Sequence, residues 1–159
     1  MTAVVGIDPG ATGGIALLDD DAQLLDIADM PYIDGLVAAP LLADLMRDHL
    51  LRCPGAVAWV EQAQAMPRQG VSSTFRYGAG YGVILGVLGA LDIPTFHIRP
   101  AMWKRTAGLN GDKAASRRRA IERWPHMASA FARVKDDGRA EAALIALHGH
   151  TMTRGQTCP

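Results

Sequence analysis

The sequence predicts an α/β fold in one domain, and three observations lead to this prediction. Short apolar runs within residues 3–30 are separated by tight turns, which is typical of an antiparallel meander of three strands. Two later apolar runs, at residues 56–60 and 93–98, alternate with segments of helical periodicity. With 159 residues, 49% of them hydrophobic, the chain can bury a core of its own. We therefore expect one domain over residues 1–148, followed by a flexible tail over residues 149–159.

The first hairpin holds a single carboxylate at a strand end. Val4, Val5 and Ile7 are all β-branched, which favours a strand that ends at Asp8. A Gly- and Pro-rich turn over residues 9–14 then brings the chain back. A rigid strand end is a usual way to position a carboxylate on a divalent metal ion. The alternative is an Asp-Pro-Gly turn that only ends the strand.

A second buried strand also ends in an acid. It follows an amphipathic helix that begins near Pro40, and the run AVAWV at residues 56–60 has the continuous apolar character of a central strand. Glu61 comes next and repeats the pattern of Asp8. Two strands that each end in an acid strengthen the metal-site interpretation, whereas the alternative for Glu61 is a solvated strand-end carboxylate.

The next helix carries small residues at four-residue intervals. It is predicted to begin near Val71, and Gly78, Gly82 and Gly86 form one stripe along it that continues to Ala90. Each interior glycine costs about 1 kcal/mol relative to alanine, so such a stripe indicates close packing. The partner is either the sheet of the same chain or the same helix of a second copy.

Charge is divided unevenly along a chain whose net charge is zero. Residues 1–98 contain eleven acidic and four basic side chains, a net charge of −7, and residues 99–139 contain the reverse, a net charge of +7. A basic third on an acidic protein is a candidate surface for a polyanion. Its alternative is a solvated basic helix. We expect four of its side chains to contact phosphates: Lys104, Lys113, Arg117 and Arg118.

The last helix begins around residues 136–138 and brings two more acids. Asp137 and Glu141 are four residues apart, so both project from one helix face. Together with Asp8 and Glu61 they make four carboxylates, which can hold two Mg²⁺ ions roughly 3.5–4 Å apart for phosphodiester cleavage. The alternative for Asp137 and Glu141 is a pair of acids that caps the helix.

Three sequence blocks carry a resemblance to a known family. They read VVGIDPGATGGIALLD, VEQAQAMPRQGVSSTFRYGAGYGVILGVL and KDDGRAEAALIA, and their order and spacing extend over about residues 3–148. The chain resembles the RuvC family of Holliday-junction resolvases, specifically its phage or prophage branch. The resemblance implies a ribonuclease H-like fold, with a five-stranded mixed sheet (the antiparallel meander plus two parallel strands) flanked by helices.

The resemblance also implies an activity and a set of residues. The expected protein is a homodimer that cuts two strands of a four-way DNA junction with Mg²⁺ or Mn²⁺, through catalytic acids at Asp8, Glu61 and Glu141. The third ligand of the family falls at Asp137. In cellular relatives the two helix acids are three residues apart rather than four, so Asp136 is a rival for this role.

One further family feature is missing. Cellular relatives place an aromatic wedge shortly after the second acid, where this chain has Gln62-Ala63-Gln64-Ala65-Met66. Either base-stacking is weaker in this chain, with less strict junction and sequence selectivity, or Met66 or Phe75 takes the place of that wedge.

Other functions remain open at this stage. The segment IDPGATGG also resembles the phosphate-binding hairpin of sugar kinases and actin-like ATPases, although those proteins need two such domains. A junction-binding protein without catalysis is a second rival, and a nuclease acting on RNA or on branched DNA generally is a third. The chain begins with no basic and apolar leader and has only two cysteines, from which we expect a cytoplasmic protein.

Overall fold

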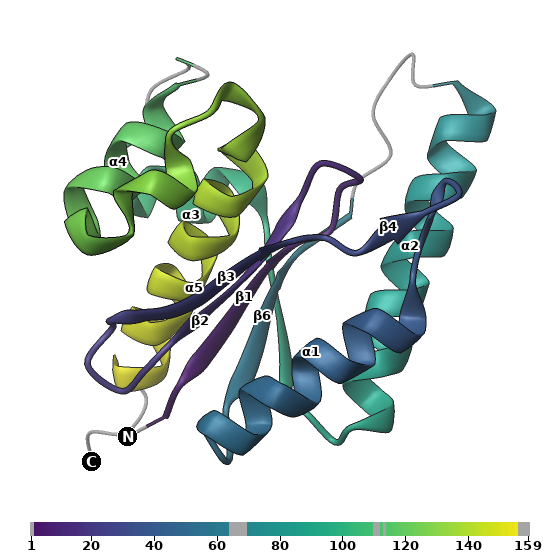
Figure 1. The fold of residues 1–159 in the computed structure, drawn as a ribbon, viewed down its shortest axis with the longest axis horizontal. Coiled ribbons are helices and arrows are strands. Elements are labelled where there is room, and N and C mark those ends of the chain that lie inside the picture. The colour runs from purple at the N-terminus through teal and green to yellow at the C-terminus, as the bar shows by residue number, and fades with distance from the viewer. Residues whose placement is uncertain (1, 64–69, 110–111, 113, 156–159) are drawn as a thin grey trace.

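A five-stranded mixed sheet forms the centre of the molecule (Figure 1). The structure is a computed structural model that describes residues 2–63, 70–109, 112 and 114–155. The order of the strands across the sheet is β3-β2-β1-β6-β7. Their bounds are Val4–Asp8 for β1, Gly14–Leu18 for β2, Leu24–Asp29 for β3, Val57–Glu61 for β6 and Thr95–Ile98 for β7.

Strand directions agree with the predicted topology. β1, β2 and β3 form an antiparallel meander, whereas β6 runs parallel to β1 and β7 runs parallel to β6. The meander follows from its tight turns, because only antiparallel strands can be joined by connections this short. The α/β fold class and the mixed five-stranded sheet are therefore confirmed.

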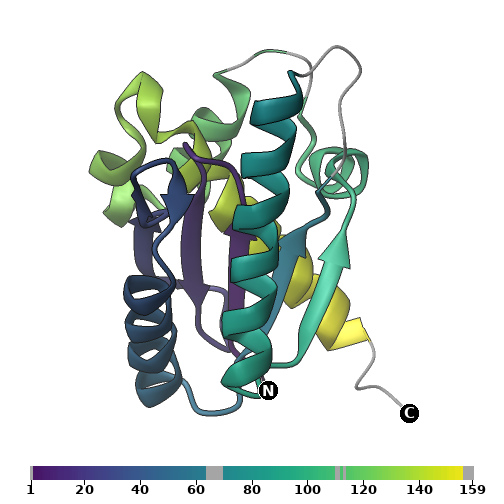
Figure 2. The same ribbon diagram turned by 90° about the vertical axis from the view of Figure 1, so that its right-hand side faces the viewer.

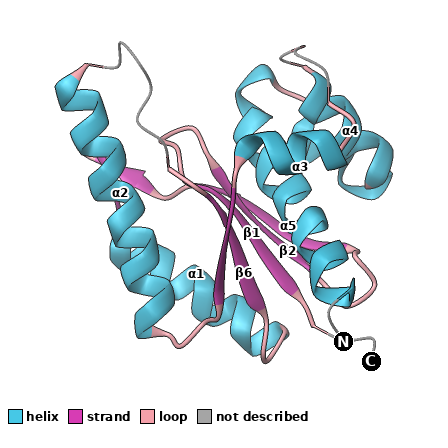
Figure 3. Ribbon diagram, turned by 180° about the vertical axis from the view of Figure 1, so that it is seen from behind, coloured by secondary structure: helices cyan, strands magenta, loops and turns pink. Residues whose placement is uncertain are grey.

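Helices cover both faces of the sheet, as Figures 1 and 2 show. On one face lie α1 (Ala39–Arg52) and α2 (Val71–Ala90). On the other lies α5 (Asp137–Gly155), joined there by the shorter helices α3 (Pro100–Thr106) and α4 (Ala115–Arg123). The view from behind shows the same three layers (Figure 3). Among the described residues, no helix is both long and apolar enough to cross a membrane.

Alternate residues of the strands feed two separate cores. Val4 packs with the α5 layer, while Val5 and Ile7 pack with the α1–α2 layer. This follows from the two-residue period of a strand, which sends successive side chains to opposite faces. β1 is therefore buried from both sides, and its backbone has little freedom up to Asp8.

Short elements connect these layers, and one of them was not expected. β4 (Tyr32–Ile33) and β5 (Leu36–Val37) pair as a small hairpin between β3 and α1, in a segment for which the sequence analysis predicted no strand. Two 3₁₀ segments, η1 (Pro125–Phe131) and η2 (Val134–Asp136), lead from α4 into α5. Two-residue strands leave almost no periodicity in a sequence, which explains why the hairpin was missed.

The C-terminal helix is longer than the sequence predicted. We expected it to end near His148 and residues 149–159 to be loose, but α5 continues to Gly155. His150 is buried and its Nε2 lies 2.9 Å from the carbonyl oxygen of Asp20, which anchors the additional turns. The expectation of a loose tail is therefore wrong for residues 149–155, and residues 156–159 lie outside the described part of the chain.

Close backbone contacts fix α5 against the sheet. A Cβ atom at Gly6 of β1 would overlap the carbonyl oxygen of Ala142 and would lie 2.7 Å from the Cβ of Ala146. At the start of α5, a Cβ at Gly138 would overlap the carbonyl oxygen of Thr12 in the β1–β2 turn. Only glycine allows an approach this close. The first turns of α5 therefore lie directly on β1 and on the turn that follows Asp8.

Candidate active site

Two of the predicted carboxylates lie at neighbouring strand ends. In the parallel pair β1–β6, Ile7 is opposite Val60, and the next residues are Asp8 and Glu61. The carboxyl ends of parallel strands meet at one edge of a sheet, so the two acids occupy the same edge. Their strands are buried, but Asp8 and Glu61 are themselves only partly so. The sequence argument that placed both acids at strand ends agrees with this geometry.

The third acid, Glu141, reaches the same edge from α5. It precedes Ala142, whose carbonyl oxygen lies against Gly6 of β1. The three acids feel one another's charge: burial, then Glu141, then Glu61 raise the pKa of Asp8 to about 7. Burial is also the main cause of the raised pKa values of Glu61 and Glu141. Partly buried carboxylates that feel one another's charge are unfavourable without a cation.

Neighbouring groups hold two of these acids in place. Trp103 of α3 is fully buried, and its indole N–H donates to Oε2 of Glu61 at 2.6 Å. The ammonium of Lys104 lies 3.8 Å from Oε1 of Glu141 and 5.1 Å above the Trp103 ring. Ser116 of α4 donates to the same Oε1 at 3.5 Å. The sequence analysis missed Trp103 and Ser116, because neither contact can be inferred without the tertiary arrangement.

The two rivals for the fourth acid have different surroundings. Asp136 has a side chain only 1% exposed, and it accepts hydrogen bonds from the backbone N–H and the guanidinium of Arg133. These bonds form a capping box and hold the pKa of Asp136 below its usual value. Asp137 is partly exposed; one oxygen accepts from Nε of Arg117 at 2.6 Å, and its charge raises the pKa of Glu141.

Gly138 gives a physical reason for the four-residue spacing. It stands three residues before Glu141, the position where the family resemblance implies an acid. Because a Cβ at Gly138 would overlap the backbone of Thr12, no side chain fits at this position. The acids at this end of the helix therefore precede Gly138, and Asp137 is one residue earlier.

The carboxylates at the sheet edge suit a hard divalent cation, although their side chains are not arranged closely enough to coordinate one. In the described part of the chain, no three His, Cys, Asp or Glu side chains stand close enough to hold a metal ion. The acids at the sheet edge nevertheless offer only carboxylate oxygens, the ligands that Mg²⁺ and Mn²⁺ prefer. A cation there would also offset the burial and the repulsion from Glu141 and Glu61 that raise the pKa of Asp8. The residues present therefore fit the predicted ion in chemistry.

The predicted phosphate-binding residues lie beside these acids. Arg117 pairs with Asp137, and Lys104 is near Glu141, as described above. Arg118 pairs with Asp112 at 2.6 Å and is largely exposed. Lys113 lies outside the described residues. Lys104 and Arg117 therefore lie beside site acids and Arg118 does not contact them, and each of these three has an acidic partner that a phosphate must replace.

Two expectations concern α2 and the loop before it: a replacement for the aromatic wedge, and a glycine stripe that packs on the sheet or on a second copy. Met66, one candidate for the missing wedge, lies outside the described residues, while Phe75 is 75% exposed on α2. The glycines at 78, 82 and 86 are exposed as well, and a Cβ atom on any of them would meet nothing within 4 Å. These three glycines do not pack against the sheet, unlike Gly80, which faces Val37.

Comparisons with known proteins agree on the fold. No protein-family model and no curated protein sequence matches the chain. Among solved structures, RuvC of T. thermophilus in complex with a Holliday junction substrate superposes with a TM-score of 0.61 and 18% identity, over 98% of this chain and 97% of that one. A second Thermus thermophilus RuvC structure gives 0.61 and 15%, over 97% of both chains.

A eukaryotic resolvase has the same architecture. The yeast mitochondrial Holliday junction resolvase Ydc2 superposes with a TM-score of 0.55 and 16% identity, over 98% of this chain and 84% of that one. The similarity covers nearly the whole chain while sequence identity is low. The chain therefore has the fold of the RuvC Holliday junction resolvases.

Proposed function

We propose that this protein is a structure-selective DNA endonuclease that cuts four-way junctions by two-metal-ion phosphodiester hydrolysis. The observation that supports this most is the meeting of Asp8, Glu61 and Glu141 at one sheet edge of a RuvC fold. Lys104 lies beside Glu141 and Arg117 beside Asp137, and such basic side chains suit a phosphodiester backbone.

The residues of the chain have distinct roles in this proposal. Asp8, Glu61, Asp137 and Glu141 would hold Mg²⁺ or Mn²⁺. When bound, such ions activate water and stabilise the leaving oxygen. Trp103 orients Glu61 through its N–H, and Lys104 limits the negative charge near Glu141.

Asp137 is preferred to Asp136 as the fourth acid. Both oxygens of Asp136 accept hydrogen bonds from Arg133, so this side chain stabilises the start of α5. Asp137 is held only through Arg117 among the described side chains, and it shares its electrostatic environment with Glu141. Substrate phosphates that attract Arg117 would free Asp137 for a cation.

A homodimer completes the proposal. Cutting two strands of one junction requires two active sites, and the exposed side of α2 is a candidate seam. Gly78, Gly82 and Gly86 face open space in the single chain, and the exposed Val71 and Phe75 lie on the same side at helical spacing. An unpartnered face with small residues allows the close approach of a second helix.

The test is single-turnover cleavage of four substrates side by side: a four-way junction, a fork, a duplex and RNA. We expect Mg²⁺- or Mn²⁺-dependent cleavage of the junction. Asp8→Asn, Glu61→Gln and Glu141→Gln should each reduce cleavage by several orders of magnitude, since metal positioning and charge stabilisation supply most of the rate. Junction binding should stay nearly unchanged, because basic residues supply the affinity.

Asp44→Asn is the matched control, because Asp44 is an exposed acid on α1, far in sequence and fold from the sheet edge. It should cut like the wild type. Cleavage by Asp8→Asn would refute the two-metal proposal. Preferential cleavage of RNA or of forks would instead favour the broader nuclease of the same fold.

A further inference from the structure

A pocket opens next to Asp8 on the α2 side of the sheet. The basic helices α3 and α4 lie on the other side. The volume of the pocket is about 320 Å³. Three segments that are distant in sequence line it: the β1–β2 turn after Asp8, the β4–β5 hairpin, and the first two turns of α2. The lining residues are Ala11, Tyr32, Gly35, Ser73, Arg76 and Tyr77. The proposed cleavage chemistry uses none of them.

Tyr77 connects this pocket to the acids. Its side chain is partly buried, and burial together with the charges of Glu61 and Asp8 raises the pKa of Tyr77 to about 12. The phenol therefore stays protonated at working pH, close enough to Glu61 and Asp8 to feel their charge. Ala11, three residues after Asp8, lines the same pocket, so the pocket begins where the candidate active site ends.

Arg76 gives the pocket a cation. Its guanidinium lies over Gly35, where Nη1 and Cζ are 3.8 and 3.9 Å from the position a Cβ would take. Gly35 has φ +83°, a backbone conformation that favours glycine, so the hairpin leaves this space to the guanidinium. No acidic side chain among the described residues forms an ion pair with Arg76, in contrast to Arg117 and Arg118.

The pocket combines what a single nucleotide needs. An exposed guanidinium without an acidic partner in the described chain suits a phosphate, and the faces of tyrosines suit a base. A pocket of a few hundred Å³ is of the size that small ligands occupy. Its place beside Asp8 favours a nucleotide of a strand that already lies over the acids.

We propose that this pocket binds the substrate-strand nucleotide adjacent to the scissile phosphate, with Arg76 on its phosphate and Tyr32 and Tyr77 against its base. The inference rests on the proposed nuclease function and adds a binding site to it. It gives the strand two anchors: the basic α3–α4 side and this pocket, with the acids between them.

The test is a set of protein–DNA mutant cycles, measured as junction binding without divalent metal so that no strand is cut. Arg76→Gln and Tyr77→Leu should each weaken binding about tenfold or more, the range measured for base stacking and charged phosphate contacts. One methylphosphonate next to the cleavage point should remove the effect of Arg76→Gln. One abasic site there should remove the effect of Tyr77→Leu.

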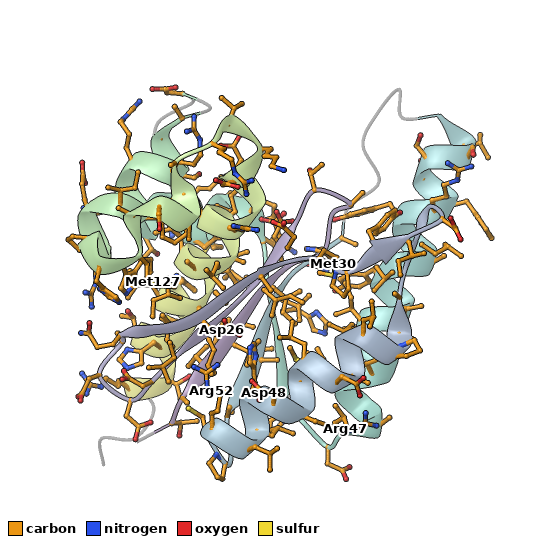
Figure 4. The ribbon with its side chains drawn as sticks, in the orientation of Figure 1. Asp26, Met30, Arg47, Asp48, Arg52 and Met127 are labelled. Atoms are coloured by element: carbon orange, nitrogen blue, oxygen red, sulfur yellow. The ribbon has the colours of Figure 1, made fainter. Side chains whose placement is uncertain are left out.

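Two variants serve as controls. Arg47→Gln removes an exposed arginine on α1 (Figure 4), a helix that contributes no residue to the pocket lining, and should bind like the wild type on every substrate. Tyr77→Phe keeps the ring and should keep the dependence on the base, which also separates a lost contact from a folding defect.

The outcomes separate this inference from the proposed function. Wild-type cleavage of junctions with unchanged binding by Arg76→Gln and Tyr77→Leu would overturn the pocket alone. Losses that no neutral phosphate or abasic site removes would also overturn it. A wild-type protein that binds no branched DNA would overturn the proposed function and this inference together.

Discussion

The two faces of the sheet use their glycines in opposite ways. On the α5 face, Gly6 and Gly138 sit where a single Cβ atom would overlap backbone atoms of the neighbouring element. On the α2 face, Gly78, Gly82 and Gly86 have nothing within 4 Å of an added Cβ. The first set brings Glu141 to Asp8 within one chain, whereas the second set makes no close contact among the described residues and, in our proposal, packs against a second copy. Identical residues in a sequence can therefore serve either folding or assembly, and only their surroundings tell which.

The largest effect on stability should come from the α5 face of the sheet, where α5 contacts the β1–β2 turn. Gly138→Ala puts a methyl group into the carbonyl oxygen of Thr12, and the atoms it meets belong to backbone, which cannot turn aside as a side chain can. We expect a loss of at least about 3 kcal/mol in the free energy of unfolding, or displacement of α5 from the turn. Urea unfolding measures the first effect, and junction cleavage reports the second through Glu141. Wild-type stability and cleavage would show that the contact is looser than described.

The next effect separates two neighbouring acids at the start of α5. Asp136→Asn weakens the hydrogen bonds to Arg133 and the capping box, so it should cost about 1–2 kcal/mol of stability and leave cleavage largely intact. Asp137→Asn should leave stability largely unchanged and abolish cleavage, since the charge of Asp137 acts on Glu141. Thermal unfolding and single-turnover cleavage, measured on both variants, give the comparison. A dead Asp136→Asn with an active Asp137→Asn would reverse the assignment.

The sequence predicted most of what brings the acids together. Strand-end acids are readable from a sequence because hydrophobic runs and turns locate strands, and Asp8 and Glu61 follow such runs directly. The position of Glu141 depends on Gly6 and Gly138, whose role emerges only when α5 meets β1. The contact of Trp103 with Glu61 joins residues 42 positions apart and has no local pattern.

Other features were missed for related physical reasons. Residues 149–155 looked featureless, yet Gly149 packs on Trp59 and His150 bonds to Asp20, so tertiary contacts extend the helix. The β4–β5 hairpin has strands of two residues, too short for any period. Local propensity therefore located the strands and most helices, while long-range contacts decided the helix end and the surroundings of the acids.

A smaller effect concerns the pH dependence of the free energy of unfolding, which we expect to reflect the raised pKa of Asp8. The pKa of Asp8 is raised from 3.8 to about 7, so the folded protein binds this proton more tightly than the unfolded chain does. Its stabilising contribution is complete below about pH 3.8 and is lost as the pH rises through about 7. Without metal, Asp8→Asn should therefore gain on the wild type between these pH values, by a few kcal/mol at most at about 1.4 kcal/mol per pKa unit.

The measurement is urea unfolding in a chelator from pH 4 to pH 8. The exposed-acid variant Asp44→Asn controls for the loss of one negative charge, and its difference from the wild type should stay flat over this range. A flat difference for Asp8→Asn as well would mean that Asp8 is not held close to the other acids. Added Mg²⁺ should reverse the order, because a cation stabilises the wild-type cluster and not the variant.

The smallest effect concerns the exposed glycine stripe of α2. It tests whether this stripe is solvent-exposed in a single chain or forms a seam between two copies. In a single chain, Gly82→Ala should stabilise α2 by about 1 kcal/mol, because alanine is the better helix former and its methyl meets nothing. Gly80→Ala on the same helix is the control: it makes the same gain in helix propensity, but its Cβ lies 3.1 Å from Val37, so the net gain should be smaller. If the stripe is a seam between two copies, Gly82→Leu should give folded monomers that nick a junction without cutting both strands, while Gly80→Ala leaves association unchanged. Sedimentation of the two variants distinguishes these cases, since a folded, dimeric Gly82→Leu would place the seam elsewhere on the surface.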